Sequence, residues 1–276
     1  MATWIVLTLL AAGVVKTPDL TRILHEVAEN QAKSQDLRRN FVYTQKQLLR
    51  LIRPNGKLAR EERREYTIVP KDRHSERVPA HFEGRYAAGN GFVAYGKPGY
   101  AYKKVDIDGG LINSFSEDLM DDGNSKDGIG PDQFPLTYHQ QLKYDFRLAA
   151  VETYRGRTVY RVAFAPKKGV GWEDGDWKGE ALIDAEEFQP VLVTTTLAWK
   201  MPMAVQILLG TNIRGLGFSV SYQKFADKVW FPVSYGGEFE VRGLFLYRRT
   251  ITIALTNSDF RHTDVNSDVA YDKDDR

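Results

Sequence analysis

The sequence predicts a mainly β protein with a few helices, built on one large, curved antiparallel sheet. Apolar and polar residues alternate through many successive segments, and neighbouring strand residues point to opposite faces, so the sheet has one apolar side. An Asn-Gly pair at 55–56 lies between two such segments, which is typical of a hairpin. Only one long segment, near the N-terminal end, has the apolar spacing of a helix.

The first residues have the character of an export signal. Residues 2–15 (ATWIVLTLLAAGVV) form an apolar run shorter than the roughly 20 residues that span a bilayer, although no Lys or Arg precedes it. We expect residues 1–15 to be a signal peptide or its remnant; a buried first strand or a misplaced start codon are the alternatives. Because the chain has no cysteine, lipid attachment through cysteine and disulfides are excluded, so an exported product should be soluble.

The next elements are a helix and a long hairpin. Residues 17–19 (Thr-Pro-Asp) predict an N-cap followed by proline at the first helical position, and the apolar stripe that follows ends near Ser34. Strands are expected at 40–53 and 58–69, joined by a type I′ turn in which Asn55 and Gly56 both have positive φ. Residues 60–65 (REERRE) mix both charges, which favours a solvated face.

Further elements follow in order. We expect hairpins at 92–102 and 105–112, an exposed acidic loop at 117–132 and a short helix at 134–142. Strands resume at 144, turn at 155–156 and return; a second pair covers 177–184 and 191–199. In the last third, four groups of alternate apolar residues each share one face: Leu216 to Tyr222, Val229 to Tyr235, Phe239 to Tyr247, and Ile251 to Leu255. Residues 16–263 form one expected domain, and 264–276 a polar tail.

The charge balance and the motifs exclude several functions. The 38 Lys and Arg nearly cancel the 36 Asp and Glu, so we expect no nucleic-acid partner. The five histidines lack metal-ligand spacing, and the residues at 215–217 (GLG) lack the third glycine of a dinucleotide fingerprint. Ser221 and Lys224 fit a Ser-x-x-Lys pattern, but they point to opposite faces of a strand. We therefore predict no catalytic residues, no metal, no cofactor and no enzyme activity.

The apolar segment 203–209 (MAVQILL) lies between two expected strands and differs from the rest of the chain. It follows a proline and ends at a glycine. The segment is either a core helix, a short helix that closes an open end of the sheet, or a loop that touches a membrane.

Three short motifs resemble those of known carriers. Residues 43–45 (Tyr-Thr-Gln) lie on the first long strand, and 179–184 (GEALID) precede a turn and 189–191 (Gln-Pro-Val). This order resembles periplasmic lipoprotein carriers of the LolA and LolB type over about residues 18–260. The resemblance implies an incomplete antiparallel β-barrel, covered by an N-terminal helix and short lid helices, whose apolar inside receives acyl chains. This chain has a longer acidic middle loop and is rich in aromatic residues, with 14 Tyr, 14 Phe and 5 Trp.

The resemblance implies a soluble, monomeric carrier in the periplasm. Its partners would be lipid or lipoprotein acyl chains and sorting proteins of the inner or outer membrane, with peripheral membrane contact. An envelope sensor or interaction module of the same fold, or an enzyme acting on a hydrophobic small molecule, are the alternatives. The residues expected to line the cavity, with an ordinary filled core as the alternative, are Leu216, Phe218, Val220, Tyr222, Phe239, Val241 and Phe245. The lid candidates are Met203, Ile207 and Leu208.

Overall fold

The computed structural model describes residues 18–71, 74–118, 136–168, 177–197, 211–214, 217–225, 228–243 and 247–263. Its helices are α1 (Leu20–Arg38), α2 (Ile107–Asp118) and α3 (Tyr138–Gln141). The first six strands are β1 (Phe41–Ile52), β2 (Leu58–Lys71), β3 (His74–Ala88), β4 (Gly91–Tyr95), β5 (Tyr144–Tyr154) and β6 (Arg157–Pro166). The remaining six are β7 (Trp177–Asp184), β8 (Pro190–Leu197), β9 (Thr211–Arg214), β10 (Gly217–Lys224), β11 (Trp230–Gly243) and β12 (Arg248–His262).

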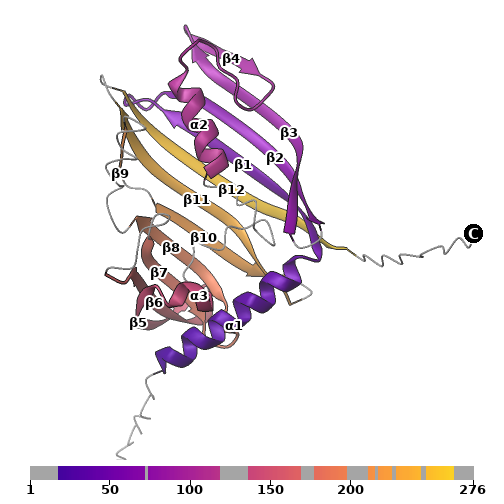
Figure 1. Cartoon of the computed structure of the whole chain (residues 1–276), viewed down its shortest axis with the longest axis vertical. Coiled ribbons are helices and arrows are strands. Elements are labelled where there is room, and N and C mark those ends of the chain that lie inside the picture. Colours follow the sequence, from indigo (N-terminus) through magenta and orange to yellow (C-terminus); the bar gives the residue numbers. More distant parts are fainter. Residues whose placement is uncertain are drawn as a thin grey trace, which may run out of the picture.

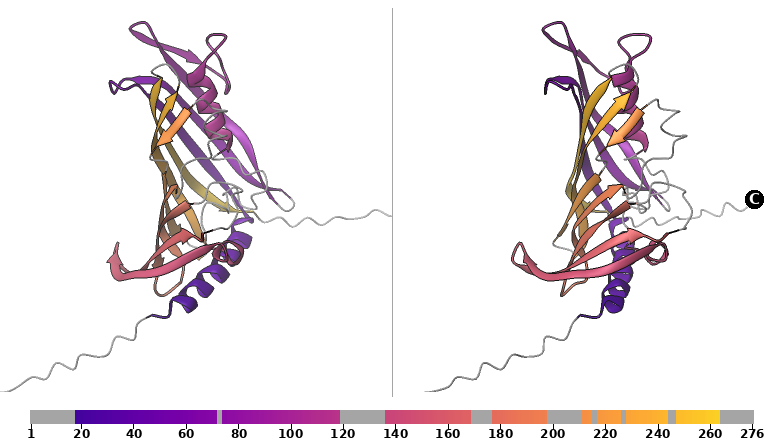
Figure 2. Two further views of the ribbon diagram at one scale, coloured as in Figure 1. Left: turned by 60° about the vertical axis from the view of Figure 1, so that its left-hand side comes forward. Right: turned by 90° about the vertical axis from the view of Figure 1, so that its left-hand side faces the viewer.

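The strands form a single open sheet. Their order is β4-β3-β2-β1-β12-β11-β10-β8-β7-β6-β5, with β9 paired to β11 beside this path, and the pairs are antiparallel. The outer strands β4 and β5 are edges, so the sheet does not close into a barrel (Figure 1). The sheet curves, and α1 and α2 lie on its concave side (Figure 2). The predicted fold class is confirmed in this part of the chain.

Helix α1 differs from its prediction at both ends. Its N-cap is Asp19, whose carboxylate accepts a hydrogen bond from the backbone N–H of Thr21 at 3.0 Å. The helix continues past Ser34 to Arg38. The buried guanidinium of Arg38 donates to the backbone carbonyl of Trp230 at 2.9 Å, which attaches the last turn of the helix to β11.

The turn at 54–57 is not the predicted type I′ turn. Gly56 has a positive φ of 77°, but Asn55 does not. Pro54 holds its own φ near −65°, which suits the second position of an ordinary type I turn and not a mirror-image turn. The type I′ pattern occurs instead in the β5–β6 hairpin, where Arg155 and Gly156 have φ values of 49° and 80°.

The two hairpins predicted within 92–112 are wrong. Only β4 is extended there, and α2 begins at Ile107. The carboxylate of Asp106 accepts a hydrogen bond from the backbone N–H of Gly109 at 3.0 Å, so it acts as an N-cap and the glycines at 109–110 enter the first helical turn. Most of the expected acidic loop lies outside the described residues, and α3 falls within the expected short helix.

A register shift breaks one predicted face. Ser221 pairs with Ser234, but Tyr222 pairs with Pro232, so Val233 is an extra residue on β11. Because such a bulge moves the alternation by one position, the residues on either side do not share one face. Tyr235 belongs to the main core cluster, whereas Val229 and Phe231 belong to a smaller one. The predicted common face for 229–235 is therefore wrong.

The main hydrophobic cluster covers the concave side of the sheet. In the described part of the chain, helices contribute only Ile23 and Val27 of α1 and Ile112 of α2 to its buried members, and the strands contribute nearly all the rest. Residues 1–15 and 264–276 lie outside the described residues, so the expected signal peptide, tail and domain limits stay predictions.

Candidate functional site

Five of the predicted lining residues lie together on the concave side of the sheet. Each is buried and belongs to the main cluster, and two neighbouring strands carry them: Phe218, Val220 and Tyr222 on β10, and Phe239 and Val241 on β11. The other candidates lie outside the described residues: Leu216 and Phe245 for the lining, and Met203, Ile207 and Leu208 for the lid. Whether any of them contacts a ligand stays a prediction.

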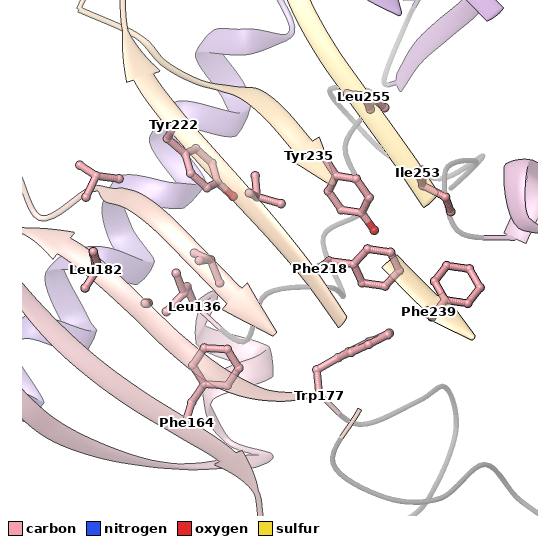
Figure 3. Close-up of a cluster of buried hydrophobic side chains, with 14 of the residues drawn as sticks. Leu136, Phe164, Trp177, Leu182, Phe218, Tyr222, Tyr235, Phe239, Ile253 and Leu255 are labelled. Carbon is pink, nitrogen blue, oxygen red and sulfur yellow. The ribbon is translucent and has the colours of Figure 1, made fainter. Parts of the chain in front are cut away.

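Aromatic rings form the centre of this apolar face. Phe218 stacks on Tyr235 with ring centroids 4.9 Å apart, and it meets Trp177 edge-on at 5.2 Å (Figure 3). The close approach of the two strands needs a glycine at 237, because a Cβ there would collide with the backbone carbonyl oxygen of Gly217 and lie 2.9 Å from Cδ1 of Phe218. Offset and edge-to-face pairs of this kind stabilise a core beyond their buried area.

A buried polar network lies beside the apolar face, under α2. Arg60, Glu62 and Arg64 alternate along β2, so they share the concave face, and Arg60 is 0% exposed. The prediction that 60–65 is a solvated face is therefore wrong for these three residues and for Glu61, which is also buried. Charged groups are buried at tolerable cost only when they are paired and hydrogen-bonded.

All three nitrogens of the Arg60 guanidinium donate a hydrogen bond. Its Nε donates to the hydroxyl of Tyr95 at 2.6 Å, and its Nη1 donates to Oδ2 of Asp106 at 2.7 Å. Its Nη2 donates to the backbone carbonyl of Tyr100 at 2.5 Å. The same guanidinium lies 4.5 Å from the ring centre of Tyr95, which adds a cation–π contact. Arg60 thus joins β2 to β4 and to the segment that leads into α2.

Glu62 completes the network. It accepts hydrogen bonds from the hydroxyl of Tyr95 at 2.7 Å and from Nη2 of Arg64 at 2.6 Å. Burial, together with the hydrogen bond to Glu62, raises the pKa of Tyr95 far above its usual range, so this hydroxyl stays protonated and donates. Two arginines and the carboxylates of Glu62 and Asp106 balance in charge, which suits a buried group of ions.

Polar contacts fasten α2 to the sheet along its length. At the N-terminal end, Asp108 accepts hydrogen bonds from the hydroxyl of Tyr247 at 2.6 Å and from Nε of Arg249 at 3.0 Å. Farther along, the hydroxyl of Ser116 accepts from Nη1 of Arg64 at 2.5 Å. Among the described helix residues, only Ile112 is a buried apolar member of the core cluster. The contacts that the described side chains of α2 make with the sheet are thus mainly ion pairs and hydrogen bonds, with Ile112 and the partly buried Leu111 as the apolar ones.

One local feature of the network is visible in the sequence. The spacing Arg-x-Glu-x-Arg at 60–64 places three charged side chains of both signs on the same strand face. The partners Tyr95 and Asp106 lie 35 and 46 residues away along the chain, so no local pattern identified them.

Two pockets that are lined by described residues lie over other surfaces of the sheet. One of about 340 Å³ is lined mainly by residues that alternate with the core positions of β1, β2 and β12, such as Lys46, Glu65 and Thr256. Another, of about 610 Å³, includes Arg63 and Arg85. Both are partly charged, so an acyl-binding cavity on the apolar side stays a prediction. In the described part, no helix is long and apolar enough to cross a membrane.

Comparisons with known proteins concern the fold. Neither a protein-family model nor a curated protein matches the chain. Among solved structures, it is similar to a DUF1329 family protein from Desulfovibrio piger, with 13% identity, a TM-score of 0.38, and 90% of this chain and 95% of that chain covered. It is also similar to a LolA superfamily protein from Nitrosomonas europaea, with 9% identity, a TM-score of 0.35, and 88% and 94% covered. A third is the lipoprotein LppX from Mycobacterium tuberculosis, with 9% identity, a TM-score of 0.28, and 88% and 96% covered.

Proposed function

We propose that the chain is an exported, periplasmic carrier that holds the acyl chains of a lipid or lipoprotein against the concave side of its sheet. One observation carries the proposal: an open, single-layer sheet has a broad aromatic and aliphatic face to which the described helices add only three buried residues. Sandwiches cover such a face with a second sheet. Here a long apolar ligand can take that place.

The hydrogen bonds and ion pairs that attach α2 to the sheet are suited to a helix that covers the apolar face and is displaced when a ligand binds. The described side chains of α2 add Ile112 and the partly buried Leu111 to the core cluster, and an acyl chain can cover the face that they leave. Burial contributes about 0.8 kcal/mol per methylene, so one sixteen-carbon chain offers roughly 12 kcal/mol before ordering costs. Breaking the contacts of Arg60 and Asp108 offsets part of this gain, which moderates affinity and allows the ligand to be released.

A buried charge on the apolar face tests the proposal. Phe218→Glu places a carboxylate beside Trp177 and Tyr235. We expect it to abolish uptake of a fluorescent fatty acid while the circular dichroism spectrum is retained. The matched control is Phe231→Glu, which buries the same charge in the smaller cluster. It should lower the melting temperature without lowering uptake per folded molecule.

The outcome separates a ligand site from a filled core. If Phe218→Glu does not fold, the milder Leu255→Gln on the same face provides the test, because this side chain is 8% exposed, compared with 4% for Phe218. Normal uptake by a folded variant would overturn the proposal. Mass spectrometry of solvent-extracted native protein should find lipid; a protein bound in its place would favour an envelope sensor, and turnover of a defined small molecule would favour an enzyme.

A further inference from the structure

The segment between β4 and α2, residues 96–107, presents apolar side chains to solvent. Val105 is 68% exposed, and Tyr102 and Ile107 are also exposed large residues. Val93 on the adjacent β4 is exposed as well, and it pairs with Tyr86 on β3. Exposed apolar residues that gather in one place mark an interaction surface more often than isolated ones do.

The same segment carries three exposed lysines. Lys97, Lys103 and Lys104 are exposed, and none forms an ion pair with an acidic side chain in the part of the chain that the structure describes. The acid within the segment, Asp106, is buried and paired with Arg60 at 2.7 Å. The charge that faces solvent from 96–107 is therefore that of three lysines, without a nearby exposed carboxylate from the segment itself.

The backbone of the segment is anchored from the inside. Arg60 holds the carbonyl of Tyr100, and the ring of Tyr102 stacks on Tyr86 with centroids 4.5 Å apart and an interplanar angle of 14°. The apolar and basic side chains are thus presented on an ordered scaffold, which lowers the entropic cost of binding. The β1–β2 turn at 53–57, with Arg53 and Lys57, lies at the same upper end of the sheet in Figure 1.

We propose that residues 96–107 dock this end of the sheet on an anionic lipid bilayer. Lysines attract anionic headgroups as point charges, and Val105 and Ile107 enter the boundary between headgroups and acyl chains, while Tyr102 stays stacked on Tyr86. Lysines interleaved with apolar residues fit a bilayer surface better than an acidic protein groove. The bilayer surface can receive charged and apolar side chains next to each other, because lipid headgroups need no defined pairing geometry. The proposal extends the carrier function to its point of contact with the membrane, but it needs no ligand on the concave side.

Vesicle sedimentation tests the docking surface. The intact chain should co-sediment with phosphatidylcholine vesicles that contain about one third phosphatidylglycerol, and raising the salt from about 0.05 M to about 0.5 M should weaken this binding. Lys103→Gln with Lys104→Gln should lower the partition coefficient about 25-fold, from about five-fold per lysine. Val105→Gln with Ile107→Gln should lower it on anionic vesicles and abolish the residual binding at high salt.

A control at the other end of the molecule makes the result specific. Leu142→Gln with Lys143→Gln removes a 72% exposed apolar residue and a neighbouring cation after α3, and it should leave vesicle binding unchanged. The two double variants in residues 96–107 are the tip variants. Equal binding of the intact chain to neutral and anionic vesicles, or wild-type binding by both tip variants, would overturn the proposal. Fatty-acid uptake measured without vesicles should be normal in the tip variants, so failure of docking and failure of the carrier function are distinguishable.

Discussion

Asp106→Asn removes one charge from the buried network and keeps the shape of the side chain. The amide oxygen can still accept from the backbone N–H of Gly109, and Asn is a good N-cap, so the start of α2 is preserved. What is lost is the carboxylate 2.7 Å from Nη1 of Arg60, a guanidinium with no exposure to solvent. The variant therefore isolates the ion pair from the helix cap.

The expected cost follows from burial. Removing one partner of a buried ion pair destabilises by about 3–5 kcal/mol, and we expect the low end because Glu62 remains 3.5 Å from Arg60. For a chain of this size, 3 kcal/mol lowers the melting temperature by about 6–12 °C. A matched exposed change, Glu29→Gln, removes a surface ion pair with Lys33 and should leave the free energy of unfolding almost unchanged, because water screens exposed pairs.

Urea unfolding and amide hydrogen exchange measure the effect. If α2 detaches locally, exchange in residues 107–118 should accelerate by up to about 100-fold while the amides of β10 and β11 keep their protection, because a factor of ten corresponds to about 1.4 kcal/mol. A loss of stability below about 1 kcal/mol, with unchanged exchange in α2, would refute the view that this ion pair holds the helix to the sheet.

Two further changes test the core and the acid sensitivity of the fold. Gly237→Ala should destabilise by about 1–3 kcal/mol in urea unfolding, because its Cβ would collide with the backbone carbonyl oxygen of Gly217 and with the ring of Phe218, whereas Gly236→Ala, with more room, should cost clearly less; equal costs would contradict the packing argument. Burial raises the pKa of Asp184, but the hydrogen bond from Arg157 and those from two backbone N–H groups outweigh this, and the net pKa lies below its ordinary value of 3.8. As the pH falls, the Asp184 carboxylate is protonated in the unfolded chain before it is protonated in the folded one. The stability from Asp184 is therefore present above about pH 4 and is lost as the pH falls through the folded pKa. The stability difference between wild type and Asp184→Asn should therefore shrink below about pH 4, and a difference independent of pH would contradict this assignment.

The alternation of residues was enough to predict the sheet. The apolar residues at 218, 220 and 222 occupy one face of β10 as expected, and α1 follows from its apolar stripe, because both patterns are set by the local geometry of strand and helix. The antiparallel pairing of successive strands followed from the short connections between them, whereas the pairing of β1 with β12 was not predicted. These features depend on neighbours along the chain.

Tertiary structure decided which charges are buried and where the alternation breaks. From its neighbours in the sequence, Arg60 is expected on a solvated hairpin. It is buried because Tyr95 and Asp106, which are distant along the chain, lie within hydrogen-bonding distance of it in the folded protein. The extra residue at Val233 depends on pairing with β10, which no pattern within β11 reveals. A strand specifies which side chains share a face, but the cost of burying a charge depends on partners that only the folded chain brings within hydrogen-bonding distance.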